Sequence, residues 1–166
     1  MTFCGNTCTE QLARDIFPEL VTILNGDNPY LRKKVCLTLI KMISIAPDLI
    51  EGIVRSLPAL LNDNDHGILI AGSFLRQSSK LFLAIQLTLV VLQHSPDYIP
   101  RFRKLVPRLV KRLRVVASGN GKAECAVGSV PDPFVQVTML KLLRVLAVDD
   151  EQATENVADV VTSVGQ

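Results

Sequence analysis

The sequence predicts an all-α fold in which helix hairpins repeat along the chain, that is, an α-solenoid. Three observations support this: apolar residues recur at helical spacing, turn residues separate consecutive apolar stripes, and the hairpin pattern returns at a fixed interval. No stretch alternates apolar and polar residues with the period of two that a half-buried strand requires. With 48% hydrophobic but only 5% aromatic residues, the 166-residue chain has the aliphatic content that helix-on-helix packing needs.

The first predicted hairpin lies near the N-terminus. Its apolar positions are Leu12, Ile16, Leu20, Ile23 and Leu24 in the first helix and Val35, Leu39, Met42 and Ile43 in the second. Between the two stripes, Gly26 suits a helix C-terminus, and Asn28 before Pro29 suits an N-cap with Pro at the first helical position. We therefore expect helices over residues 9–24 and 29–45.

The hairpin recurs farther along the chain. The junction Ala46-Pro47-Asp48-Leu49-Ile50 returns as Ser95-Pro96-Asp97-Tyr98-Ile99, with an offset of 96 − 47 = 49 residues. Pro58 and Pro107 have the same offset, and we expect Phe17-Pro18, Leu57-Pro58 and Val106-Pro107 to open comparable helices. Self-similarity of this kind is typical of armadillo/HEAT-like solenoids.

Two segments are longer than the repeat pattern predicts. Aligning Leu24 with Leu61 gives a step of 61 − 24 = 37 residues, 12 fewer than 49, which predicts an insertion at residues 73–84. Residues 117–131 hold three glycines and few large apolar side chains, which predicts a surface loop. After it, we expect Asp132 to cap a helix over residues 133–148. The predicted core positions of that helix are Val135, Met139, Leu142, Leu143 and Leu146.

Charge and hydropathy exclude several classes of protein. The formal net charge is only +2, from 18 basic and 16 acidic residues, so the whole chain is not predicted to bind nucleic acid or an anionic surface. No apolar run reaches the ~18–20 residues of a membrane span, and residues 82–92 are better explained as a buried helix. The four cysteines, Cys4, Cys8, Cys36 and Cys125, form no CxxC pair and are expected to be free thiols.

The sequence offers no constellation that catalysis or metal binding requires. His66 and His94 are the only histidines and neither belongs to a metal-binding motif. Cys4 and Cys8 lie four residues apart without two further ligands, and residues 119–122 lack the ending of a phosphate-binding loop. We therefore predict no catalytic residue, no metal and no cofactor, and hence a protein that is not an enzyme.

Basic residues cluster in two places, and two roles for these clusters are compatible with the sequence. Arg101, Arg103, Lys104, Arg108, Lys111, Arg112 and Arg114 form a run in which the leucines at 105, 109 and 113 are expected to face the core. This run is either a solvated helix face or a patch for an acidic protein partner, an anionic leaflet or nucleic-acid phosphates. The residues proposed for a subunit or acidic-partner interface are Arg32, Lys33, Lys34, Arg101, Arg108, Lys111 and Arg112.

Three segments resemble a known family. Asn28-Pro29-Tyr30-Leu31-Arg32-Lys33-Lys34, Phe102-Arg103-Lys104-Leu105-Val106-Pro107 and Asp132-Pro133-Phe134-Val135-Gln136-Val137 are similar to the adaptin N-terminal region of gamma-type large subunits of clathrin adaptor complexes. The resemblance covers most of the chain. It implies that residues 1–166 form a single segment of the trunk, which is the helical-repeat region of such a large subunit. The insertion at 73–84 and the loop at 119–130 depart from the family pattern.

The resemblance implies a function as well as a fold. It implies an armadillo-like trunk that holds a small sigma subunit, pairs with a large beta subunit, and takes part in clathrin recruitment and cargo sorting without binding nucleic acid. It also implies a cytoplasmic protein that associates peripherally with the trans-Golgi network, endosomes and coated vesicles. The alternative is another helical-repeat module whose basic face binds an acidic protein or RNA.

Overall fold

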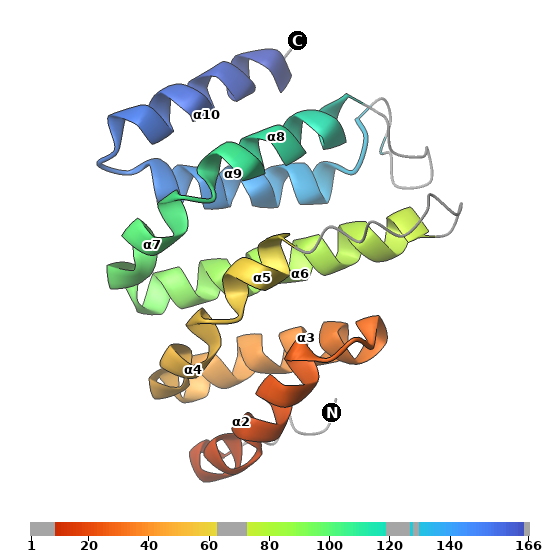
Figure 1. Cartoon of the computed structure of the whole chain (residues 1–166), viewed down its shortest axis with the longest axis vertical. Coiled ribbons are helices and arrows are strands. Elements are labelled where there is room, and N and C mark those ends of the chain that lie inside the picture. Colours follow the sequence, from red (N-terminus) through yellow and green to blue (C-terminus); the bar gives the residue numbers. More distant parts are fainter. Residues whose placement is uncertain (1–8, 63–72, 119–126, 128–129, 165–166) are drawn as a thin grey trace. The chain divides into compact units, whose positions relative to one another are not determined.

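The computed structural model describes residues 9–62, 73–118, 127 and 130–164 (Figure 1). These residues are helical apart from turns and one isolated β-bridge between Val127 and Val130, so the predicted all-α class is confirmed. The chain divides into two compact units, and each is described by itself. The first comprises residues 1–64 and 79–96, and the second comprises residues 65–78 and 97–166.

The first unit begins with the predicted hairpin of α2 (Glu10–Asn25) and α3 (Pro29–Ile45). Both helix starts are capped: the Thr9 hydroxyl accepts the amide of Leu12 at 3.4 Å, and the Asn28 side chain accepts the amide of Tyr30 at 3.0 Å. The amide of Gly26 donates to the Ile23 carbonyl at the end of α2. Because caps and Pro29 fix these ends locally, the predicted bounds are correct within one residue.

Helix α3 supplies most of the hairpin core. Its predicted positions Val35, Leu39, Met42 and Ile43 have no exposed surface. Each such side chain contributes about 1.5–3 kcal/mol by leaving water. The stripe of α2 is less complete, because Leu20 and Leu24 are buried whereas Leu12 remains exposed.

Cys36 is a free, buried thiol, and burial is the main cause that raises its pKa from 9.0 to about 11. In the unfolded chain the thiol ionises above pH 9, whereas in the folded chain it stays neutral up to about pH 11. We therefore expect its contribution to stability to be complete below pH 9. It should be lost as the pH rises through the folded pKa, by about 1.4 kcal/mol for each pH unit between the two values.

This prediction is checked by unfolding the wild type and Cys36→Ala in urea at several pH values on both sides of 9. The wild type should lose additional free energy of unfolding at high pH that the variant does not lose. If the free energy of unfolding of the wild type and of Cys36→Ala fell equally at high pH, the assigned role of the thiol would be contradicted.

The junction repeat is confirmed in three dimensions. The first copy of the junction is η1 (Pro47–Leu49), α4 (Ile50–Val54) and α5 (Leu57–Asn62), and the second copy is η2 (Pro96–Tyr98), α7 (Ile99–Arg103) and α8 (Val106–Ala117). The starts of these paired elements are offset by 96 − 47, 99 − 50 and 106 − 57, each equal to 49 residues. Pro58 and Pro107 follow each break, because proline lacks the amide that would continue the preceding helix.

Pro18 behaves differently from Pro58 and Pro107. We expected it to open a comparable helix, but this is wrong: Pro18 lies inside the continuous helix α2. Proline has no amide to donate to the carbonyl four residues earlier, yet the helix continues through this position, where Pro18 is exposed.

The longest helix in the described part of the chain is α6 (Ser73–His94). Most of its side chains from residue 83 to residue 92 are buried, namely Leu83, Ala84, Ile85, Leu87, Thr88, Leu89, Val91 and Leu92. The hydroxyl of Thr88 donates to the Ala84 carbonyl at 2.8 Å, so the one polar member is satisfied. The buried helix predicted at 82–92 is therefore confirmed, and none of the described helices is both long and apolar enough to cross a membrane.

The predicted insertion at 73–84 forms the first half of α6. The described backbone shows no helix break between these residues and the rest of the helix. That the segment is an insertion stays a prediction.

In the second unit, α8, α9 (Pro133–Ala147) and α10 (Glu151–Val164) pack against one another, and α7 packs against α9. All five predicted core positions of α9 are buried. Leu109 and Leu113 of α8 are also buried, while Leu105 is half-buried. The predicted surface loop at 117–131 begins at the last residue of α8 and lies mostly outside the described residues, so it too stays a prediction.

Candidate protein-binding surfaces

The basic cluster of the first unit lies in the first turns of α3. Lys33 is exposed, and Arg32 and Lys34 are half-buried. The Lys34 ammonium lies 5.8 Å from the centroid of the Tyr30 ring, within cation–π range. Tyr30 itself is 64% exposed, so α3 presents an aromatic ring and two lysines at its surface.

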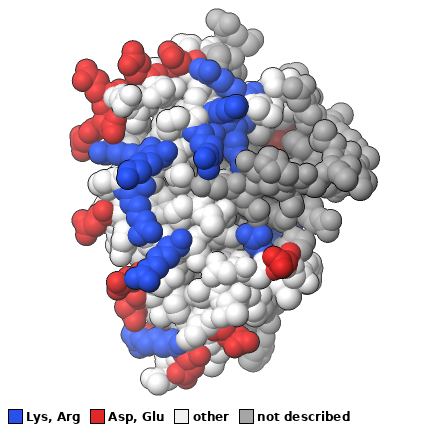
Figure 2. Space-filling view, in the orientation of Figure 1, with Lys and Arg blue, Asp and Glu red and all other residues white. Residues whose placement is uncertain are grey.

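The basic cluster of the second unit lies on α7 and α8. Arg101, Arg108 and Lys111 are exposed, and Arg112 is half-buried. Figure 2 shows Lys and Arg atoms gathered over these two helices. In the described part of the chain, no ion pair joins Arg101, Arg108 or Lys111 to an acidic side chain. Their charges are therefore presented to solvent, as the helical spacing predicts, and their role in binding stays a prediction.

Arg103 belongs to the same sequence run but points into the structure. Its guanidinium donates to the carbonyl of Leu146 at 3.3 Å and to that of Val148, and it lies 3.7 Å from an oxygen of Asp150. The other carboxylate oxygen of Asp150 accepts the amide of Ala153 at the start of α10. Arg103 thus ties α7 to the end of α9 and the start of α10.

A second arginine forms an ionic contact in the first unit. Arg14 of α2 donates to Asp48 of η1 at 3.0 Å and to Glu10 one turn earlier. The hydrogen bond from Arg14 lowers the pKa of Asp48, and the bond to Asp48 raises the pKa of Arg14. Because all three side chains are solvent-exposed, we expect this contact to contribute little to stability.

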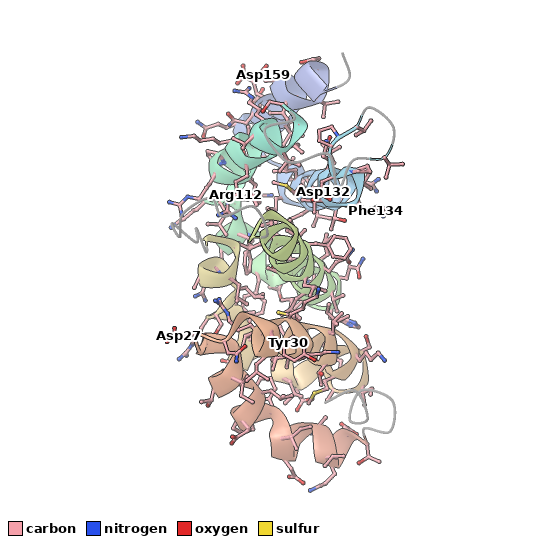
Figure 3. The ribbon with its side chains drawn as sticks, turned by 90° about the vertical axis from the view of Figure 1, so that its right-hand side faces the viewer. Asp27, Tyr30, Arg112, Asp132, Phe134 and Asp159 are labelled. Atoms are coloured by element: carbon pink, nitrogen blue, oxygen red, sulfur yellow. The ribbon has the colours of Figure 1, made fainter. Side chains whose placement is uncertain are left out.

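Sequence reasoning missed the apolar side chains that α3 and α9 present to solvent. Tyr30 and Leu37 are exposed on α3, and Phe134 and Val137 are exposed on α9. The signal was present, since these residues fall outside the core stripe of each helix at helical spacing. Figure 3 labels Tyr30 and Phe134, which stand in the first turns of their helices.

Asp132 precedes α9, but the prediction that its side chain caps this helix is wrong. Its backbone is left-handed, with φ 42° and ψ 60°, and its side chain makes no capping hydrogen bond. One carboxylate oxygen is buried without a hydrogen-bond partner in the structure. Gln136 stabilises the turn instead by donating to the Pro131 carbonyl at 2.6 Å.

We expect Asp132→Asn to raise the free energy of unfolding by about 1 kcal/mol, because asparagine tolerates left-handed backbone and carries no charge to desolvate. The measurement is urea unfolding followed by circular dichroism. Asp27→Asn, at an exposed position, is the control and should stay within about 0.5 kcal/mol of the wild type. Destabilisation by Asp132→Asn would show that the carboxylate has a favourable partner.

Within the described ranges, no group of three or more His, Cys, Asp or Glu side chains could hold a metal ion. His94 is exposed at the last residue of α6. His66, the cysteines at 4, 8 and 125, and residues 119–122 lie outside the described residues.

The repeated helix hairpins of this chain place it in the class of α-helical repeat proteins. Proteins of this class typically bind partners over broad surfaces. The family model described as "Adaptin N terminal region" matches residues 1–164, so this chain belongs to that family. The resemblance drawn from the three motifs is thereby confirmed.

Similar proteins include several with gamma in their names. The AP-1 complex subunit gamma of Dictyostelium discoideum is 33% identical over 160 residues, covering 96% of this chain and 16% of that protein. AP-1 complex subunit gamma-2 of Arabidopsis thaliana is 34% identical over 161 residues, 96% of this chain and 17% of its own length. The human AP-1 complex subunit gamma-like 2 is 33% identical over 154 residues, 93% of this chain and 18% of its own length. This chain therefore spans less than a fifth of each relative.

Proposed function

We propose that this chain is a segment of the large gamma-type subunit of a clathrin adaptor complex and acts as a non-catalytic scaffold in intracellular protein transport and vesicle coat assembly. The observation that carries the proposal is the family match over residues 1–164, with gamma subunits among the similar proteins. A scaffold of this kind needs ordered helices and a broad surface, and both units provide them.

The partners in this proposal are a small sigma-type subunit and a large beta-type subunit, with clathrin and the membrane reached indirectly. The protein would then work in the cytoplasm, on the trans-Golgi network, endosomes and coated vesicles. The two basic clusters supply the electrostatic part of the subunit contacts, which speeds association and favours acidic partner surfaces. The clusters are Arg32, Lys33 and Lys34 on α3, and Arg101, Arg108, Lys111 and Arg112 on α7 and α8.

The alternative function is RNA or acidic-protein binding through α7 and α8 alone. The exposed arginines and Lys111 favour it. However, α10 of the same unit exposes a row of Glu151, Glu155 and Asp159, and Figure 2 shows acidic atoms on the same face as the basic ones. Phosphates laid across this face would meet repulsion as well as attraction, which favours a discrete protein partner.

Binding to the sigma-type subunit tests the proposal. We expect saturable binding in isothermal titration calorimetry, and we expect Arg108→Glu with Lys111→Glu to weaken it by about three- to tenfold at low salt, less at high salt. Arg55→Glu, an exposed arginine outside both clusters, is the control and should bind like the wild type. RNA binding with a steep salt dependence, without sigma binding, would support the alternative.

The same preparation tests the division of roles within the subunit. An acidic-dileucine peptide should show no specific affinity in fluorescence anisotropy, because the resemblance places the peptide-binding elements largely outside this segment. Saturable binding that is abolished by replacing both leucines with alanine would contradict this expectation.

A further inference from the structure

The second unit exposes a row of positive charge on α8. Arg108, Lys111 and Val115 are exposed, and spacings of three and seven residues place them on one face of the helix. Neither α7 nor α8 contains an Asp or a Glu, so no acidic side chain of these two helices neutralises the row. Val115 is 55% exposed and adds an apolar contact at the end of the row. We call these three residues the basic row.

The neighbouring helix α10 exposes a row of the opposite sign. Glu151, Glu155 and Asp159 are exposed at spacings of four and eight residues, and α10 contains no Lys or Arg. We call these three residues the acidic row. With a rise of about 1.5 Å per residue, the basic row is about 10 Å long and the acidic row about 12 Å long. The two rows are therefore opposite in sign and similar in length.

Both rows belong to the same compact unit. Helices α8 and α10 pack against each other, and Figure 1 shows them running in the same direction. Figure 2 shows Lys and Arg atoms and Asp and Glu atoms together on this face. Among the residues that the structure describes, no ion pair joins Arg108 or Lys111 to Glu151, Glu155 or Asp159. The charges of each row thus remain available to a partner.

A surface that carries two parallel rows of opposite charge is complementary to a second copy of itself. A two-fold rotation about an axis that runs between α8 and α10, parallel to both, lays the basic row of each copy on the acidic row of the other. A partner with charge of one sign, such as a phosphate backbone, would be attracted by one row and repelled by the other. The charges of this face therefore favour a second copy of this chain as the occupant.

We propose that the face formed by α8 and α10 is the contact surface of a two-fold symmetric dimer, in which Arg108 and Lys111 of each copy meet Glu151, Glu155 and Asp159 of the other. Two helix contacts of this length bury little area, and exposed ion pairs contribute little each, so we expect a weak, salt-sensitive dimer. The inference goes beyond the proposed function, although it uses two residues of the same basic cluster. Its test needs the chain alone, so dimerisation and binding of the sigma-type subunit succeed or fail separately.

The test is sedimentation equilibrium of the 166-residue chain at increasing protein concentration and at low and high salt. We expect the wild type to approach the mass of a dimer and no more, with a dissociation constant that rises with salt. Arg108→Glu with Lys111→Glu should raise this constant by about tenfold or more at low salt, because carboxylates then face carboxylates. Glu151→Lys with Glu155→Lys should do the same, because cations then face cations.

Mixing the two charge-reversed variants should restore a dimer, because the acidic α8 of one variant then meets the basic α10 of the other. This rescue distinguishes a broken contact from a loss of folding, which circular dichroism of each variant also checks. The control is Lys33→Glu with Arg55→Glu, which reverses two exposed cations outside this face. This control variant should dimerise like the wild type.

Each other outcome would overturn the proposal. It is wrong if the wild type stays monomeric up to about 1 mM, or if its dissociation constant is the same at low and high salt. It is also wrong if the mixed variants stay monomeric although each is folded. Association that grows beyond the dimer would show that the copies are arranged head to tail, which excludes the two-fold contact.

Discussion

Phe102→Ala is expected to lower the free energy of unfolding by about 3–5 kcal/mol, the cost typical of deleting a fully buried phenylalanine. Phe102 has no exposed surface, and it lies in α7, which packs against α9. The five residues of α7 make too few internal hydrogen bonds to be stable alone, so this ring is the main apolar anchor of the helix. The loss would be a large fraction of the roughly 5–15 kcal/mol that stabilises a domain.

Urea unfolding followed at the helical circular dichroism band measures this effect. Phe134→Ala is the matched control, because it deletes the same atoms from a 70% exposed position, and it should cost less than about 0.5 kcal/mol. Equal losses at the two positions would show that burial of Phe102 does not anchor α7.

Arg103→Ala should cost about 2–3 kcal/mol, the second largest effect that we expect. The substitution removes the donor from the carbonyls of Leu146 and Val148 and the cation beside Asp150. Hydrogen bonds that involve a charged group contribute about 1.5–3 kcal/mol, and acceptors left without a donor add to the loss. Arg103→Lys should recover only part of it, because an ammonium cannot span two carbonyls as the planar guanidinium does.

The control for Arg103 is its neighbour Arg101, which is exposed and belongs to the same basic run. Arg101→Ala should change the free energy of unfolding by less than about 0.5 kcal/mol in the same urea experiment. If Arg101→Ala and Arg103→Ala were equally mild, the contacts of Arg103 would be of no consequence for stability.

The helices were predictable because their determinants are local. The caps at Thr9 and Asn28 and the breaks before Pro58 and Pro107 act through residues within one turn, so the sequence alone locates them. The core side of α9 was predictable too, since its five core positions share one helical face. Asp132 was mispredicted because its residue type suits an N-cap, whereas its left-handed backbone directs the side chain elsewhere.

The surface roles were less predictable, because they depend on residues far away in the sequence. Arg101 and Arg103 look alike in the basic run, and only the position of the end of α9, 43–45 residues later, makes Arg103 structural. Similarly, the sequence shows that Tyr30 and Phe134 lie off the core stripe. It does not show whether another helix of the chain covers them.

The contacts of Arg103 also have a consequence for how α7 is stabilised during synthesis. Helix α7 is held by α9 and by the residues just after it, which the ribosome adds more than forty residues later. Closing so long a loop carries an entropic cost that only the completed contacts repay. Until Val148 and Asp150 have emerged, the nascent chain therefore lacks the complete set of contacts that ties α7 to the end of α9.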